Sequence, residues 1–270
     1  EAQSLLSDTL AIPTYARVSS RLLATLHDHA DDPLVSMQVA LALFELQEWA
    51  HAELAFEQAA LVNDPYPDAL AYLGLSRSRQ GKAGEAWILA AIQMAPDNPY
   101  VWYANGIYLR DQRRFEESLD ALANAIAFAP GDPFFMAELS MSYRVLGDMD
   151  AAEYWLRQAV ERSGNAEEFQ QMLLLFYAEE GYRLTDEGLR QLADASQSLP
   201  NDPDLRSSYG WALHTMGRTD DALTEISVAL SLAPENARAN YYRGRIAFDE
   251  GNLDLATEYL TRVAVSISPY

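Results

Sequence analysis

A period of 34 residues runs through most of the chain. Proline-containing linkers recur at this spacing, because Pro96 and Pro130 are 34 residues apart and so are Pro200 and Pro234. Working outward from these prolines divides the sequence into seven units of 32 to 36 residues: 33–66, 67–98, 99–132, 133–166, 167–202, 203–236 and 237–270. Self-similarity at such a period indicates small units stacked side by side, each too small to bury its apolar face alone. This period limits the possible folds more than any other feature.

Each unit has the pattern of two helices joined by a turn. Apolar residues follow helical spacing in the first half of each unit, as in Pro133–Leu146. A glycine at the fifteenth position suits the left-handed backbone at a helix end, and it occurs five times, as Gly81, Gly147, Gly181, Gly217 and Gly251. Asn98, Asp132 and Asp202 stand directly before prolines, where they are good N-caps for the next helix. The pattern predicts an all-α chain of helical hairpins.

Small residues recur at positions eight, twenty and twenty-seven, where helices must approach closely. Position eight holds glycine in four units, and position twenty-seven holds alanine in six. Position twenty is assigned to Ala52, Ala86, Ser118, Ala152, Gly188, Ala222 and Ala256. This alignment predicts that the second unit is two residues short between Ala86 and Pro96. The fifth unit departs from the pattern at position eight, which holds Leu174.

With these positions aligned, residues 33–270 resemble the tetratricopeptide repeat family. Unit 99–132 is the best single match, and it carries the family's residues at Trp102, Gly106, Leu109, Phe115, Ala125 and Pro130. The first unit departs from the pattern, with Asp64 in place of the linker proline. The resemblance implies a right-handed α-solenoid of about seven stacked 34-residue helix-turn-helix repeats, whose first helices line a concave groove.

The two ends of the chain differ from the repeats. Residues 1–32 are expected to form N-terminal capping helices: a short one around Gln3–Leu10 and a longer one over Thr14–Ala30. The longer helix has an apolar stripe of Tyr15, Val18, Leu22, Leu23 and Leu26. At the other end, no polar cap follows Val265. This pattern fits a truncated chain, a longer tail, or an end that docks on a partner or a second copy.

Composition restricts the partners rather than the fold. Forty acidic residues against nineteen basic ones give a net charge of −21, which argues against binding to nucleic-acid phosphates or anionic membranes. No stretch is apolar for long enough to insert into a membrane. We therefore expect a soluble protein, and leave the compartment open between a bacterial cytoplasm and a periplasm. The first residue is Glu1 rather than Met, which fits a processed chain, a trimmed chain or a chain whose first part is missing.

The sequence contains no recognisable catalytic or metal-binding pattern. Cysteine is absent, and His27 and His29 are two apart, so their side chains diverge on a helix. Gly81-Lys82 lacks the spacing and the hydroxyl residue of a phosphate loop. We expect no catalytic residue, no metal ligand and no cofactor.

The resemblance implies that positions two, five, six, nine, twelve and thirteen of each unit face the groove. The candidate groove residues at these positions include Tyr72, Arg79, Tyr100, Tyr103, Arg110, Phe134, Glu138, Arg144, Trp211, Tyr241, Tyr242 and Arg245, and also Asp68, His214 and Phe248. Aromatic side chains can anchor a peptide with little loss of conformational entropy. The lysine and asparagine with which chaperone-binding relatives hold a C-terminal carboxylate are missing, so that type of binding is not expected.

Arg79, Arg110 and Arg144 recur near the ends of three successive first helices. One interpretation is an arginine ladder that holds a carboxylate or an acidic peptide. The other is that these arginines pair with neighbours such as Asp111 and Glu138 and only order the groove. The sequence leaves both open.

Three functions fit these observations. The first is a non-enzymatic scaffold that binds a protein or peptide segment, acidic or helical, in its groove. The second is a structural subunit that docks through its convex face and its uncapped C-terminal end, self-association included. The third is the regulatory repeat region of a longer enzyme.

Overall fold

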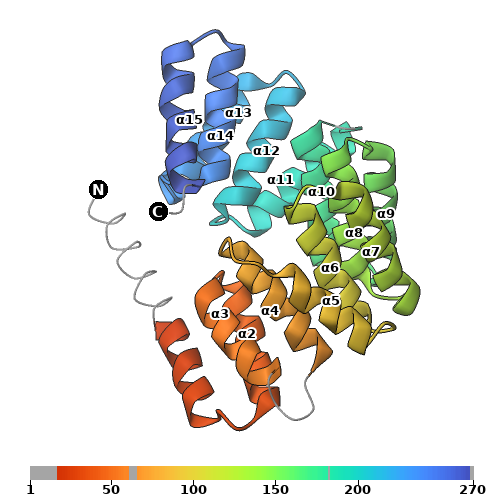
Figure 1. Cartoon of the computed structure of the whole chain (residues 1–270). Helices are drawn as coiled ribbons and strands as arrows, with labels where there is room; N and C mark the ends of the chain where they lie inside the picture. Colours follow the sequence, from red (N-terminus) through yellow and green to blue (C-terminus); the bar gives the residue numbers. More distant parts are fainter. Residues whose placement is uncertain (1–16, 61–65, 182, 268–270) are drawn as a thin grey trace. The chain divides into compact units, whose positions relative to one another are not determined.

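The computed structural model describes residues 17–60, 66–181 and 183–267, and all regular structure in these residues is helical. Three parts of the sequence predictions lie outside them: the short helix at Gln3–Leu10, Tyr15 and the linker residue Asp64. Residues 17–28 are helical and precede the first hairpin. The prediction of an all-α chain of helical hairpins is confirmed (Figure 1).

The remaining helices pair in chain order. They are α2 (Pro33–Glu45), α3 (Trp49–Ala60), α4 (Pro67–Arg79), α5 (Glu85–Met94), α6 (Pro99–Asp111), α7 (Phe115–Phe128), α8 (Pro133–Leu146), α9 (Met149–Arg162), α10 (Glu167–Glu180), α11 (Asp186–Ser198), α12 (Pro203–Thr215), α13 (Thr219–Leu232), α14 (Ala237–Asp249) and α15 (Leu253–Ile267). Each even-numbered helix packs against the odd-numbered helix that follows it, which gives seven hairpins in the described part of the chain. We call the even-numbered helices first helices and the odd-numbered ones second helices.

The contacts divide the chain into two units, residues 1–163 and 164–270. Unit 1 contains the helix at residues 17–28 and helices α2 to α9. Unit 2 contains helices α10 to α15. Within each unit, a second helix also packs against the first helix of the next hairpin, as α3 does on α4 and α13 on α14. This is the adjacent packing of a tetratricopeptide-like stack.

The starts of the first helices follow from local sequence. The side chains of Asn98, Asp132 and Asp202 accept hydrogen bonds from backbone N–H groups of the following helix, with proline at its first position. Asp32 caps α2 in the same way. These hydrogen bonds join residues two or three apart, so the start of each of these helices is set by local sequence.

The turn inside each hairpin uses a left-handed residue at position fifteen. The predicted glycines have positive φ, with Gly147 at 83°. The first and third units place Gln47 and Arg113 there, at φ 58° and 60°. The geometry of the turn therefore requires the left-handed conformation, and Gln47 and Arg113 adopt it although it is strained for residues other than glycine.

The small residues at position eight let two helices touch. A Cβ on Gly106 would lie 2.6 Å from Leu122, and one on Gly210 would lie 2.8 Å from Ile226. Leu122 and Ile226 are themselves fully buried. In the fifth hairpin, where Leu174 occupies this position, α10 and α11 approach each other over a shorter stretch than the other pairs do. A bulky side chain between two helices keeps their backbones apart.

The alignment of the second unit needs a correction. Ala86 is exposed, and the residue that touches Gly74 across the hairpin is Gly84. The shortening therefore lies before Gly84, in the turn and the start of the second helix, and not between Ala86 and Pro96. As a result α5 begins only at Glu85, directly after the close contact.

Each unit has its own apolar core. The core of unit 1 extends from Leu26 to Ala121, and that of unit 2 from Ala178 to Ile246. The helix at residues 17–28 joins the first core through buried Leu26, with Leu22 and Leu23 packed beside it. Val18, expected in the same stripe, is 44% exposed. Of the apolar stripe, the leucines in the later turns of this helix reach the core.

Candidate functional site

The candidate site is the face formed by the first helices, which we call the first-helix face. In unit 1, α4 packs beside α6 and α6 beside α8. In unit 2, α10, α12 and α14 pack in the same order. The predicted groove residues all lie on these helices, and each unit is described separately below.

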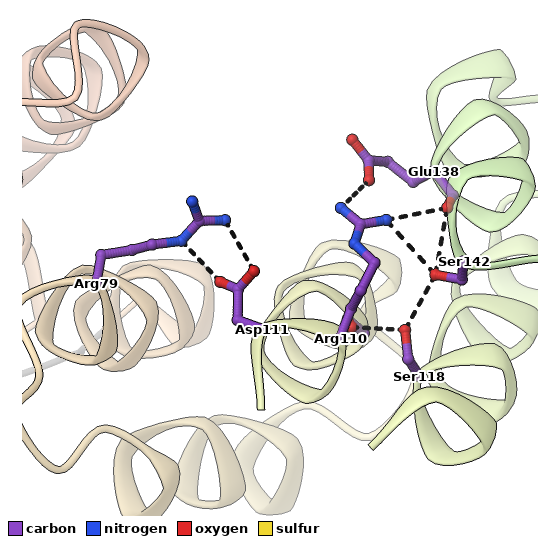
Figure 2. Close-up of polar contacts among 7 residues, drawn as sticks. Arg79, Arg110, Asp111, Ser118, Glu138 and Ser142 are labelled. Atoms are coloured by element: carbon purple, nitrogen blue, oxygen red, sulfur yellow. Dashed lines mark hydrogen bonds and ion pairs between the residues drawn. The ribbon is translucent and has the colours of Figure 1, made fainter. Parts of the chain in front are cut away.

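Arg79 and Arg110 are paired with carboxylates of the next hairpin (Figure 2). The Arg79 guanidinium lies 2.7 Å from the Asp111 carboxylate, and the Arg110 guanidinium lies 2.6 Å from that of Glu138. Arg144 is half-buried on α8. The pairs join α4 to α6 and α6 to α8. This arrangement matches the interpretation in which the arginines order the face.

The Arg110–Glu138 pair belongs to a longer polar chain. Arg110 also donates to the Glu138 carbonyl oxygen at 3.2 Å and to the Ser142 hydroxyl at 3.5 Å. Ser142 lies 3.2 Å from Ser118, whose hydroxyl donates to the carbonyl oxygen of Gly106 at 2.8 Å (Figure 2). The side chains of Arg110 and Glu138 are only 14% and 22% exposed. These bonds cross the junction between two hairpins and fix it.

The aromatic candidates of unit 1 divide into buried and exposed ones. Tyr72 is only 9% exposed and packs against Phe44 and Phe56, with ring centroids 5.6 and 5.5 Å away. Tyr100 and Phe134 are 48% and 53% exposed. The ring of Tyr72 is therefore part of the core, while Tyr100 and Phe134 present apolar surface to solvent.

Unit 2 brings four candidates together. Trp211 of α12 stacks on Tyr242 of α14 at 5.1 Å, and the Arg245 guanidinium lies 5.9 Å from the Trp211 ring. Arg245 also donates to the Tyr241 hydroxyl at 3.3 Å. Tyr242, expected at the groove surface, is only 5% exposed, because stacking places its ring between neighbouring helices. His214 contacts Trp211, and its ring nitrogens face Thr219 and Asp249.

The same polar bond recurs at the start of the first helices in both units. The Asn98 amide donates to Asp68 at 2.5 Å, and the Asn236 amide donates to Asp204 at 3.0 Å. Both aspartates occupy position two of their repeat, and both asparagines cap the next first helix. Sequence reasoning missed these bonds, although the shared positions are a signal that could have revealed them.

Burial changes the titration of several groups on the unit 1 face. It raises the pKa of Asp68, against which the hydrogen bond from Asn98 acts, and the pKa of Asp111, against which Arg79 and Arg110 act. Burial, with the nearby Glu138 charge, also raises the pKa of Tyr103. The Tyr103 phenol is neutral and the face holds its carboxylates in a partly dehydrated setting.

Replacing Asp68 by asparagine is expected to stabilise the protein at pH 7 and to have little effect near pH 3. The folded-state pKa of Asp68 is raised, so its contribution to stability is fully present below the unfolded-state pKa of about 3.9 and is lost as the pH rises through the folded-state value. Asparagine does not titrate and keeps the oxygen that accepts from Asn98. Urea-unfolding midpoints of both proteins at pH 3 and pH 7 measure the difference.

Asp120→Asn is the control, because Asp120 is exposed on α7 and carries no partner among the described residues. This control measures how much stability changes when one negative charge is removed from a chain with a net charge of −21. An equal gain from the two substitutions would contradict the burial argument for Asp68.

The described residues contain no group of three or more histidine, cysteine, aspartate or glutamate side chains that could hold a metal ion. Within the same part of the chain, no helix combines the length and the apolar character needed to cross a bilayer. In unit 1, the first-helix face combines the ion pairs of Arg79 and Arg110 with the exposed rings of Tyr100 and Phe134.

Solved structures support the fold. A tetratricopeptide repeat protein from Parabacteroides merdae superimposes with a TM-score of 0.68 at 16% identity, over 87% of this chain and 93% of that protein. A human IFIT1 dimer with PPP-AAAA gives 0.62 at 18% identity, over 94% and 69% of the two chains. Yeast Tom70 gives 0.58 at 15% identity, over 96% and 56%. At these identities the likeness is one of fold alone.

Sequence comparison identifies the family directly. No curated protein sequence matches this chain. A family model described as tetratricopeptide repeat matches residues 100–240, just over half of the sequence. This match agrees with the seven helical hairpins, the glycine contacts at position eight and the similar solved structures. The chain belongs to the tetratricopeptide repeat family.

Proposed function

We propose that this protein is a non-enzymatic scaffold that binds a segment of another protein on its first-helix face. The observation that carries the proposal is the exposure of Tyr100 and Phe134 on α6 and α8, beside charges that are already paired. Exposed aromatic side chains held by rigid helices are typical anchors for a partner. Such a surface gains binding energy by covering the rings.

The arginines take a supporting role in this proposal. An acidic peptide that bound Arg79 or Arg110 would have to displace Asp111 or Glu138, each already within 2.7 Å of its arginine. Displacement leaves a half-buried carboxylate without its partner, which is unfavourable. We therefore assign Arg79 and Arg110 to the order of the face and Tyr100 and Phe134 to contact with the partner.

Nucleic acid is not the proposed ligand. The human IFIT1 structure is described with PPP-AAAA, but it shares only 18% identity with this chain. The net charge of −21 opposes the approach of phosphates, and the lysines and arginines needed to neutralise them are few. A protein segment fits the face better.

A second candidate, an assembly subunit that docks through its outer surface, is favoured by a different set of residues. The second helices expose large apolar side chains: Leu54, Leu89, Phe128 and Tyr154, each between 47% and 56% exposed. They are spread over four helices, α3, α5, α7 and α9. This candidate predicts that binding depends on the second helices rather than on the first.

The test is a selection from displayed random peptides of about twelve residues against the full chain. The variant carries Tyr100→Ala and Phe134→Ala, and the matched control carries Leu89→Ala and Tyr154→Ala, which removes comparable apolar surface from second helices. We expect the substitutions Tyr100→Ala and Phe134→Ala to lower the affinity for the recovered peptides about tenfold or more. The control substitutions should leave this affinity unchanged. The reverse pattern would support the assembly candidate and reject the proposed one.

A further inference from the structure

An arginine on the first-helix face of unit 2 lies beside an aromatic ring and has no carboxylate partner. The Arg245 guanidinium of α14 lies 5.9 Å from the Trp211 ring centroid and donates to the Tyr241 hydroxyl at 3.3 Å. Within the described part of the chain, Arg245 forms no ion pair. Asp249, one helical turn farther along α14, faces the His214 ring at 3.4 Å. The positive charge of Arg245 therefore stays unmatched.

Unit 1 contains the same arrangement with its carboxylate in place. The Arg79 guanidinium lies 5.4 Å from the Trp49 ring centroid and 2.7 Å from the Asp111 carboxylate. A second N–H group of Arg79 donates to the other oxygen of Asp111 at 3.3 Å (Figure 2). An aromatic ring attracts the face of a guanidinium, while a carboxylate binds two N–H groups along its edge. Arg245 has the ring and lacks the carboxylate.

The other arginines of α14 have different surroundings. Arg238 lies 3.2 Å from the Glu179 carboxylate, and Arg243 is half-buried with its guanidinium 5.5 Å from the Tyr259 ring of α15. Arg245 is exposed. Carboxylates outnumber basic groups by forty to nineteen in this chain, so the missing partner of Arg245 does not reflect a shortage of acidic residues. Its guanidinium is open to a carboxylate from another molecule.

Two exposed aromatic rings flank Arg245. Tyr241 and Phe248 stand four residues before it and three residues after it, so the three side chains share one face of α14. Tyr241 is 40% exposed and Phe248 is 57% exposed. Beside the guanidinium, Trp211 is stacked on Tyr242 at 5.1 Å with 7° between the ring planes, and Tyr242 is buried. The helices thus hold a cation between two apolar surfaces.

We propose that Arg245 binds an aspartate or glutamate side chain of a partner segment. The carboxylate takes the place beside Arg245 that Asp111 has beside Arg79, and accepts two N–H groups of the guanidinium. Tyr241 and Phe248 cover apolar residues on either side of this acidic residue. The inference goes beyond the proposed function, because it adds a contact within unit 2 and names the chemistry of the residue bound there.

The charge of the whole chain limits what else the segment carries. A net charge of −21 repels strongly acidic segments, whereas a segment with one carboxylate and a neutral or positive total charge is not repelled. A phosphorylated residue brings close to two negative charges and is disfavoured for the same reason. The partner is therefore a segment with a single acidic residue between apolar neighbours.

The test uses the random library described above, with the C-terminus of each peptide fused to its carrier so that every free carboxylate is on a side chain. One selection uses the original chain and a parallel one uses Arg245→Met, which keeps an unbranched side chain beside Trp211. We expect aspartate or glutamate between apolar residues to be enriched only in the first selection. Peptides with this motif should bind Arg245→Met about tenfold more weakly in titration calorimetry.

A double-mutant cycle with the peptide isolates the contact. Replacing the selected glutamate by glutamine should weaken binding to the original chain by about the same factor, and should add nothing in Arg245→Met. Independent effects of the two substitutions would reject a direct contact between Arg245 and this carboxylate.

The matched control is Arg262→Met, which removes the same charge from α15. The Arg262 guanidinium lies 5.0 Å from the Tyr259 ring centroid, and its carboxylate partner Glu258 is already in place at 2.6 Å. We expect this variant to bind the peptides like the original chain. Equal weakening by Arg262→Met would overturn the inference, because the effect would then follow from overall charge.

The outcomes separate this inference from the proposed function. Peptides that need Tyr100 and Phe134, but carry no selected carboxylate and ignore Arg245, would overturn this inference alone. Peptides that need Arg245 and ignore Tyr100 and Phe134 would support it and reject the contact residues proposed in unit 1. An empty selection would count against both.

Discussion

Gly84→Ala is expected to lower the free energy of unfolding by about 3 kcal/mol or more. A Cβ at this position would lie 2.0 Å from the carbonyl oxygen of Gly74 and 2.9 Å from its carbon, so backbone meets backbone. Gly84 has φ −121° and ψ −21°, which alanine adopts readily, so the effect is one of space and not of conformation. Urea unfolding followed by circular dichroism measures it.

Substitutions at two further glycines, Gly106 and Gly131, should give smaller losses of stability than Gly84→Ala. Gly106→Ala meets the Leu122 side chain at 2.6 Å, and a side chain can shift where a carbonyl group cannot, so we expect a smaller loss. Gly131→Ala meets no atom within 4 Å and has no positive φ, so we expect a change below about 0.5 kcal/mol. Similar losses at Gly84 and Gly131 would show that the α4–α5 contact is not as close as described.

Arg110→Met is expected to lower the free energy of unfolding by about 2 kcal/mol. The substitution leaves Glu138 half-buried without its cation and removes the bonds to the Glu138 carbonyl oxygen and to Ser142. The loss is smaller than for a fully buried pair, because Arg110 and Glu138 keep 14% and 22% of their side-chain exposure. The same unfolding measurement applies.

A double-mutant cycle separates the pair from its surroundings. Adding Glu138→Gln to Arg110→Met should recover part of the loss, because it removes the unpaired charge. Arg190→Met is the control, because both side chains of the Arg190–Glu187 pair within α11 are more than 60% exposed. This pair should contribute less than about 0.5 kcal/mol to the free energy of unfolding. No recovery in the double variant would mean that Arg110 acts through packing alone.

The hairpins could be predicted because their signals are local. Asn98, Asp132 and Asp202 cap helices through bonds that span two or three residues, and the turn glycines act through their own backbone angles. The misassigned Ala86 shows where this reasoning fails. A two-residue gap can be placed at several points of a repeat with equal agreement, and only the contact between Gly84 and Gly74 selects one.

The candidate site was predictable to a smaller extent. The groove prediction treated all its positions alike, whereas Tyr100 and Phe134, both at position two, are exposed and Tyr72 and Tyr242, both at position six, are buried. The rings at position six are covered by aromatic side chains of other helices, Phe56 over Tyr72 and Trp211 over Tyr242, and these contacts arise only when the helices pack.

The sequence by itself determined the all-α hairpin architecture, the family and the set of side chains from which a binding face could be built. These follow from a period of 34 residues and from caps and turns that act over a few residues. Only the tertiary structure decided that Arg79 and Arg110 pair with Asp111 and Glu138, and that Asp68 accepts a hydrogen bond from Asn98. Charge pairing across 28 to 32 residues depends on distances between packed helices, and those distances arise only when the hairpins stack.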